Sequence, residues 1–189
     1  RFYIDYIDFI HDAQPLEPGW IYYDNGVNVD AVGLTAGGSF MWGVRFPASM
    51  MAGFAGCSLT KVSLFDYEAH TGKVMIYQGG ATAPGTLIHQ QPYTCTGSND
   101  FVETTLTSVL PIDPTQDLWV VMNNDNGQYV ASACDDTGDP NGRFISIDGV
   151  EWDDVAALGL PYTWMIRAYV SDGAKSRAIS SDDAISAIK

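Results

Sequence analysis

Apolar and polar residues alternate along several short segments of the chain. Between Phe40 and Phe46 the apolar side chains occupy every second position, and Trp164, Ile166, Ala168 and Val170 repeat that spacing near the C-terminal end. A period of two predicts a β-strand with one buried face. Residues 118–122 are apolar at every position, which predicts a central strand that is covered on both faces.

Short runs rich in β-branched and aromatic residues, bounded by Gly, Pro, Asn and Asp, predict further strands. They lie at residues 20–23, 59–65, 74–77, 86–90, 101–106 and 144–147. Turns are predicted at Asp24-Asn25-Gly26 and at Asp148-Gly149, a two-residue hairpin pair. A single helical turn is expected within residues 48–56, and no longer helical pattern separates the strands. The spacing therefore predicts an all-β fold, an antiparallel β-sandwich of the jelly-roll type with about eight strands.

The pattern divides the chain into three parts. We expect an N-terminal arm or extra strand at residues 1–18, the sandwich domain at 19–170, and a polar linker or short C-terminal helix at 171–189. The chain opens with Arg1 instead of Met, so we expect it to be covalently part of a larger multidomain chain. Its apolar runs are shorter than the ~20 residues of a membrane span, so no membrane insertion is expected.

The charge is strongly acidic, with nine Lys and Arg against 23 Asp and Glu and a net charge of −14. Nucleic-acid binding is not expected, because phosphate contacts require clustered Lys and Arg. Most of the acids are aspartates, which favour turns and caps over helix interiors. The three cysteines, Cys57, Cys95 and Cys134, do not form a complete disulfide framework, and their pairing stays open.

Acidic turns are the candidate metal sites. Residues 135–142 place oxygen ligands at alternate positions, and residues 24–30 form a second such cluster. Calcium takes six to eight oxygen ligands, so a structural Ca²⁺ would be held by Asp24, Asn28, Asp30, Asp135, Asp139 and Asn141. The alternative is that Asp and Asn stand here because they form turns well. If calcium binds, it should raise the melting temperature.

Aromatic residues near predicted turns are the candidate ligand-binding residues. Tyr and Trp offer flat apolar faces that match the C–H face of a sugar ring. We assign this role to Trp152, Tyr129 and Tyr162. For Trp152 the alternative is a plug over the end of the sandwich, whereas Trp42, Trp119 and Trp164 lie in strand patterns and are expected in the core.

Motifs for catalysis are sparse. The three histidines, His11, His70 and His89, lie in segments that read as polar ends or loop edges, and the usual nucleophile and zinc motifs do not occur. Glu103 lies in a predicted strand and is expected on its solvent face. We therefore expect no enzymatic activity, although a Cys–His pair or two carboxylates can still meet in space.

Several short motifs occur together in one order. They are Gly19-Trp20 with Asp24-x-Gly26, Leu59-Thr60-Lys61-Val62, Val74-x-Ile76-Tyr77-x-Gly79, Leu118-Trp119-Val120, Gly149-Val150-x-Trp152 and Trp164-x-Ile166-Arg167-Ala168-Tyr169-Val170. With them the chain resembles the jelly-roll modules of secreted bacterial adhesins and peptidases, the cleaved-adhesin or haemagglutinin-type domains of gingipain-like proteins. In that family a calcium loop follows a Trp, and the matching stretch here, residues 20–30, is shorter and has fewer acids.

The resemblance implies an accessory module on a larger protein. Its function would be adhesion at the extracellular surface of a bacterium, with a host or matrix protein or a glycan as partner and calcium as a structural ion. One alternative is a carbohydrate-binding module attached to a glycan-degrading enzyme, which a line of exposed aromatic residues on one sheet would favour. The other is a hydrolase domain with a site assembled from loops, which a cleft joining a histidine to a cysteine or to paired carboxylates would favour.

Overall fold

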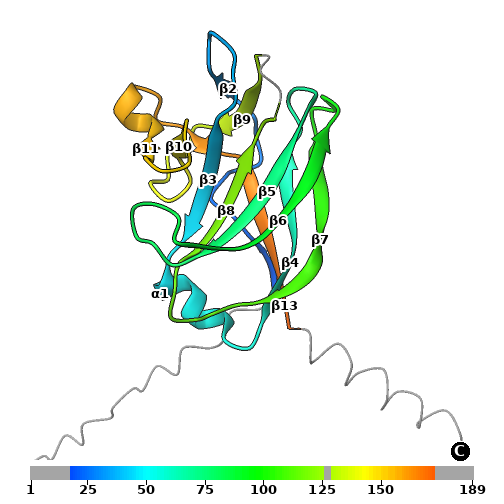
Figure 1. Ribbon diagram of the computed structural model, residues 1–189, viewed down its shortest axis with the longest axis vertical. Coiled ribbons are helices and arrows are strands. Elements are labelled where there is room, and N and C mark those ends of the chain that lie inside the picture. The colour runs from blue at the N-terminus through cyan, green and yellow to red at the C-terminus, as the bar shows by residue number, and fades with distance from the viewer. Residues whose placement is uncertain (1–17, 126–128, 173–189) are drawn as a thin grey trace, which may run out of the picture.

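The described part of the chain is built of antiparallel β-strands (Figure 1). The computed structural model describes residues 18–125 and 129–172. A four-stranded sheet has the order β1 (Gly19–Ile21), β13 (Ile166–Ser171), β4 (Ser58–Phe65) and β7 (Phe101–Pro111). A six-stranded sheet has the order β11 (Asp153–Asp154), β10 (Phe144–Ser146), β3 (Met41–Phe46), β8 (Leu118–Asn123), β5 (His70–Gln78) and β6 (Thr86–Cys95). A small third sheet has the order β12 (Thr163–Trp164), β9 (Ala131–Asp135) and β2 (Asp30–Gly33).

The all-β antiparallel sandwich is confirmed. Successive strands β3, β4, β5, β6, β7 and β8 pass between the two larger sheets four times, which is how a jelly roll connects its layers. The predicted helical turn is found as α1 (Ala48–Met51) and η1 (Ala52–Phe54), and a second short helix, η2 (Val155–Leu158), follows β11. No helix in the described residues is both long and apolar enough to cross a membrane.

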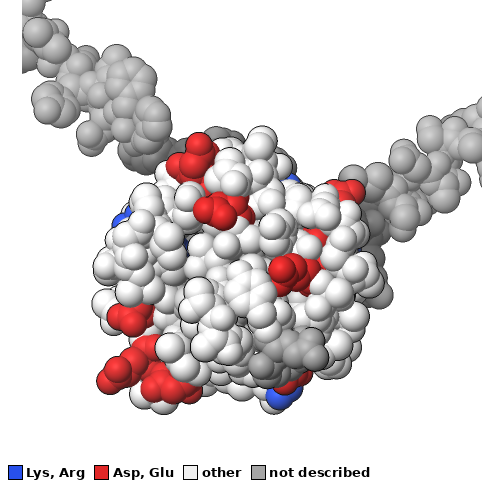
Figure 2. Space-filling model, turned by 90° about the horizontal axis from the view of Figure 1, so that it is seen from above, with Lys and Arg blue, Asp and Glu red and all other residues white. Residues whose placement is uncertain are grey.

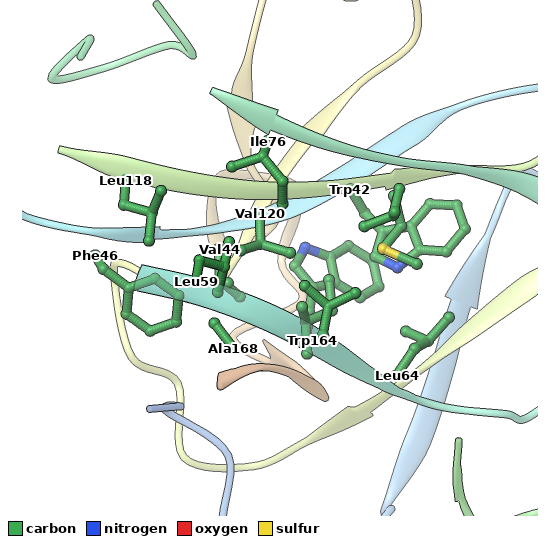
Figure 3. Close-up of a cluster of buried hydrophobic side chains, with 14 of the residues drawn as sticks. Trp42, Val44, Phe46, Leu59, Leu64, Ile76, Leu118, Val120, Trp164 and Ala168 are labelled. Atoms are coloured by element: carbon green, nitrogen blue, oxygen red, sulfur yellow. The ribbon is translucent and has the colours of Figure 1, made fainter. Parts of the chain in front are cut away.

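The main core fills the space between the two larger sheets (Figure 3). Alternate side chains of β3 point into it, and Trp42, Val44 and Phe46 are fully buried. From the facing sheet come Leu59 and Ala168, which are also fully buried. Burial of apolar surface at about 25 cal/mol per Å² makes this layer the main source of stability.

The segment predicted as one strand at 163–170 is divided between two sheets. Trp164 pairs with Cys134 in β9, whereas Ile166 pairs with Leu64 in β4. Met165 lies at the crossing, where its N–H donates to the carbonyl of Ala133 at 3.3 Å. The predicted alternation survives the crossing, because Trp164, Ile166, Ala168 and Val170 are all buried.

Several strands differ from the prediction. The described residues contain thirteen strands instead of about eight, because short pieces such as β2, β9 and β11 were not predicted. β9 reads Ala-Ser-Ala-Cys-Asp, without a β-branched or aromatic residue, and it forms a strand because it is fully buried and paired on both edges. The expectations for residues 1–17 and 173–189 lie outside the described residues.

The prediction of a two-residue hairpin turn at Asp148-Gly149 is wrong. Strand β10 ends at Ser146, and the pair nearest the turn that joins it to β11 is Ile145↔Asp153. The connection is therefore longer than two residues. The Asp148 carboxylate accepts hydrogen bonds from the backbone N–H groups of Val150 at 2.8 Å and Glu151 at 2.9 Å. An aspartate side chain that takes nearby backbone donors builds a wider loop in place of a tight hairpin.

Candidate functional site

The outer surface of the four-stranded sheet carries a row of aromatic and charged side chains. Residues 166, 168 and 170 of β13 face the core, so Arg167 and Tyr169 face outward. The register places Trp20 of β1 and Lys61 of β4 on either side of Tyr169. We call this surface the aromatic face, and its members are Trp20, Tyr22, Lys61, Phe65, Phe101, Glu103, Arg167 and Tyr169.

One half of the aromatic face is organised around Tyr169. Its ring meets Trp20 edge to face, with 5.1 Å between centroids. The ammonium group of Lys61 lies 5.6 Å from the centre of the Tyr169 ring, and it also donates to the Glu103 carboxylate at 3.0 Å. Glu103 is half exposed, as its alternation predicted. Aromatic contacts of this kind hold the rings in one orientation while leaving ring surface at the solvent.

The other half is organised around Arg167. The guanidinium carbon lies 3.7 Å from the centre of the Phe101 ring and 4.4 Å from that of Tyr22. Phe101 in turn meets Phe65 edge to face at 5.3 Å. Tyr22 is 47% exposed and the other rings of the face are partly exposed. Both distances from the guanidinium carbon are within the ~6 Å of a cation–π interaction.

The buried carboxylate of Asp24 binds the guanidinium of Arg167. The Arg167 Nε donates to both carboxylate oxygens of Asp24 at 3.1 Å, and Nη2 donates to Oδ1 as well. Asp24 is almost fully buried, at 4% exposure, and its Oδ1 also accepts the N–H of Gly26 at 3.0 Å. Gly26 has a positive φ of 83°, which the tight turn at this point requires. The turn predicted at residues 24–26 therefore positions the carboxylate that pairs with Arg167.

The structure brings the two predicted acidic turns together. The backbone N–H of Asn25 donates to the Asp135 carboxylate, and the Asn25 amide donates to Asp136 at 3.1 Å. The Asn28 amide nitrogen faces the carbonyl oxygens of Asp30 at 2.7 Å and Cys134 at 3.1 Å. Residues that are far apart in the sequence, 24–30 and 135–141, thus form one region.

Most side chains proposed as calcium ligands already bind protein groups. Asp135 is fully buried and also accepts from Thr137 Oγ1 at 2.7 Å. Asn141 Oδ1 accepts from Arg45 at 3.2 and 2.6 Å, and Asp139 accepts the N–H of Asn141 at 2.8 Å. Within the described residues, His, Cys, Asp and Glu form no group of three or more arranged for a metal ion. Calcium binding stays a prediction, and an ion would compete with these donors.

The three aromatic residues predicted as ligand-binding lie apart from the aromatic face. Trp152 is half-buried against Trp119, 6.0 Å between ring centroids, on the outer side of the six-stranded sheet. Tyr129 is 53% exposed and precedes β9. Tyr162 packs against the main core, and a hydrogen bond to Asp30 raises the pKa of its phenol. No ring contact joins any two of the three in the described residues.

The described histidine His70 and the thiols of Cys95 and Cys134 lack the features of a reactive pair. His70 is buried, not at a polar edge as predicted, and its ring nitrogens contact the Glu68 carbonyl and the Tyr93 hydroxyl, each at 2.7 Å. Burial, together with the nearby Asp66, raises the pKa of the Cys95 thiol, and burial raises the pKa of Cys134 to about 12. A nucleophilic cysteine needs a lowered pKa. His11 lies outside the described residues.

Comparison with known proteins bears on the fold. No protein-family profile matches the sequence, and no curated protein matches it. The structure is similar to the crystal structure of the cysteine protease and lectin-like domains of Cwp84, a surface layer associated protein of Clostridium difficile. The TM-score is 0.51 at 13% sequence identity, over 70% of this chain and 32% of that one. The chain thus spans about a third of that structure, and the likeness is one of fold.

Sequence reasoning missed most of the aromatic face. The alternation at 164–170 already implied that Arg167 and Tyr169 face away from the core. The pairing of β1 with β13, which sets Trp20 against Tyr169, carries no local signal. Phe101 reaches Arg167 across two strand boundaries, a contact that depends on the order of strands in the sheet.

Proposed function

We propose that this chain is a non-catalytic accessory module of a larger bacterial surface protein, and that it binds glycan through the aromatic face. The observation that carries the proposal is the row of partly exposed rings on one sheet, Trp20, Tyr169, Tyr22 and Phe101. The fold likeness to a surface-layer protein that contains a lectin-like domain supports it. Among the expectations from sequence, this arrangement favours the carbohydrate-binding module.

The chemistry of the aromatic face suits a sugar chain. Rings held at a surface offer apolar planes for the C–H faces of sugars, and neighbouring polar groups bond the hydroxyls. Lys61 and Glu103 lie beside Tyr169 and are about half exposed. Three strand spacings of about 4.8 Å give the face a width of roughly 14 Å from β1 to β7. Strands position side chains more rigidly than loops do, so the rings need little reordering on binding.

A host or matrix protein is the alternative ligand for the same accessory module. We favour glycan because the rings lie beside Lys61 and Glu103, half-exposed polar groups that can bond sugar hydroxyls. Structural calcium at the acidic turns is a further part of the proposal, and it concerns stability more than the ligand. The acidic turns reach the aromatic face through Asp24.

A glycan array with the whole 189-residue chain tests the function. We expect retention on a defined group of glycans, and we expect Trp20→Ala and Tyr169→Ala to lower that binding at least tenfold, because stacking on aromatic rings is removed. Trp152→Ala is the matched control, since it removes a Trp that packs on the outer side of the other large sheet. Thermal melts establish that each variant is folded.

The outcomes separate the alternatives. Loss of binding in Trp152→Ala, with Trp20→Ala unaffected, would move the site to the residue predicted from the sequence. A blank glycan array, with retention of a matrix protein, would replace the glycan proposal by protein adhesion. Turnover of any retained glycan would refute the non-catalytic part of the proposal.

A further inference from the structure

The two cations of the aromatic face are each paired with a carboxylate of the same region. Arg167 is bound by Asp24 and Lys61 by Glu103. We infer that the aromatic face accepts neutral glycans and excludes acidic ones, and that Asp24 and Glu103 set this selectivity. The inference rests on the proposed function and concerns the class of glycan.

The Arg167 pair is built into the fold. The Asp24 side chain is fully buried, whereas that of Arg167 is 21% exposed. Nε and Nη2 of Arg167 are bonded to Asp24, and among the described residues Nη1 has no hydrogen-bond partner. Nη1 can therefore donate to a sugar hydroxyl. The carboxylate behind it cancels the charge that would otherwise attract a sugar carboxylate.

The Lys61 pair is at the surface. The ammonium group lies 3.0 Å from Glu103, with side-chain exposures of 40% and 51%. Such a pair adds little to stability, because solvent screens it. The pair does neutralise the charge of Lys61, the second cation of the aromatic face. An incoming ligand senses this neutralisation within a Debye length of about 8 Å at physiological salt.

The charge of the rest of the molecule also disfavours acidic glycans. The net charge is −14. On the end of the molecule shown in Figure 2, acidic side chains form several separate groups and basic side chains are few. An acidic polymer is therefore repelled at a distance and meets paired cations at the face. A neutral polymer is subject to neither effect, so stacking on the rings decides its binding.

Affinity electrophoresis of the whole chain in gels that contain polysaccharide tests the inference. The neutral probes are a β-glucan and a mannan, and the acidic probe is polygalacturonate. Wild type should be retarded by a neutral probe and migrate freely in polygalacturonate. Glu103→Gln leaves the Lys61 charge unpaired and should strengthen binding to polygalacturonate about two- to fivefold at low salt. High salt should remove that gain.

Glu151→Gln is the matched control. It changes the net charge by the same amount, and Glu151 lies in the exposed loop between β10 and β11, away from the aromatic face. Equal gains in Glu103→Gln and Glu151→Gln would overturn the inference, as would retention of wild type by polygalacturonate as strong as by a neutral probe. In both cases the glycan-binding function would stand. Free migration in all probes and a blank array would refute the function itself.

Discussion

At the scale of single residues, Asp66 accepts more hydrogen bonds than any other carboxylate of the described residues. It is 1% exposed and accepts the backbone N–H groups of Thr96 at 2.9 Å, Gly97 at 2.8 Å and Ser98 at 3.2 Å. The hydroxyls of Thr96 and Ser98 donate to it as well. Burial by itself would raise the pKa of Asp66, but these bonds outweigh it and lower the pKa from 3.8 to about 2. A single carboxylate thus holds the turn between β6 and β7.

Asp66 makes stability depend on pH in the acid range. Because its pKa is lower in the folded state, its contribution is present above about pH 4 and is lost as the pH falls towards 2. Asp66→Asn should lower the free energy of unfolding at pH 7 by on the order of 2–3 kcal/mol, because the amide loses the negative charge and sets an NH2 group against donors that one carboxylate oxygen accepted. It should also flatten the acid dependence. Urea unfolding at several pH values measures both.

Asp153→Asn is the control for Asp66, because that carboxylate is exposed on the edge strand β11. We expect its unfolding curves to match wild type within about 0.5 kcal/mol at every pH. An acid dependence as steep in Asp66→Asn as in wild type would show that other carboxylates carry the effect.

At the scale of elements, β8 joins two separate apolar layers. Leu118, Val120 and Met122 belong to the main core. Trp119 and Val121 face the other way, into a second cluster that Trp152 and side chains of the neighbouring strands cover. The indole N–H of Trp119 donates to the Gly80 carbonyl at 2.8 Å, which satisfies its one polar atom. A strand that is apolar on both faces was predicted to be central, and β8 lies between β3 and β5.

The second cluster should carry as much stability per residue as the main core. We expect Trp119→Ala to lower the free energy of unfolding by about 3–5 kcal/mol, because its side chain is fully buried. Trp152→Ala should lower it by about 1 kcal/mol, since Trp152 is partly exposed and covers one side of the cluster. Equal effects of the two variants in urea unfolding would contradict this division.

At the scale of the whole molecule, much of the acidic charge at the two turns is paired within the fold. The acidic turns at 24–30 and 135–141 converge, and much of their bonding capacity is used by Arg167, Arg45 and backbone donors. In a chain of net charge −14 each such pair relieves repulsion. A calcium ion that displaced these hydrogen bonds and ion pairs would have to bind with a larger gain in free energy than they contribute.

Calcium should raise the melting temperature by a few degrees. For a site of millimolar affinity, a tenfold excess of ion adds RT ln(1 + [L]/Kd), about 1.4 kcal/mol. In a chain of this size that corresponds to roughly 3–6 °C. Scanning calorimetry in 10 mM CaCl₂ and in EDTA measures the shift, with MgCl₂ as the ionic-strength control. Identical melts in all three would remove calcium from the proposal.

The alternation of apolar residues determined the fold class and the buried faces by itself. Trp42, Val44 and Phe46 are buried and β8 is central because the side-chain period of a strand is a local property. Segments without that signal, such as β9, became strands only through neighbours on both edges. Their pairing is non-local, and the composition of the segment does not encode it.

The candidate site was decided by the tertiary structure. Each acidic turn was visible in the sequence, but their convergence depends on β2 pairing with β9. The aromatic face exists because β1 pairs with β13, which sets Trp20 beside Tyr169, and because Asp24 reaches Arg167 across 143 positions of the chain. Strand order and register place these side chains together, and both are set by burial of the whole core.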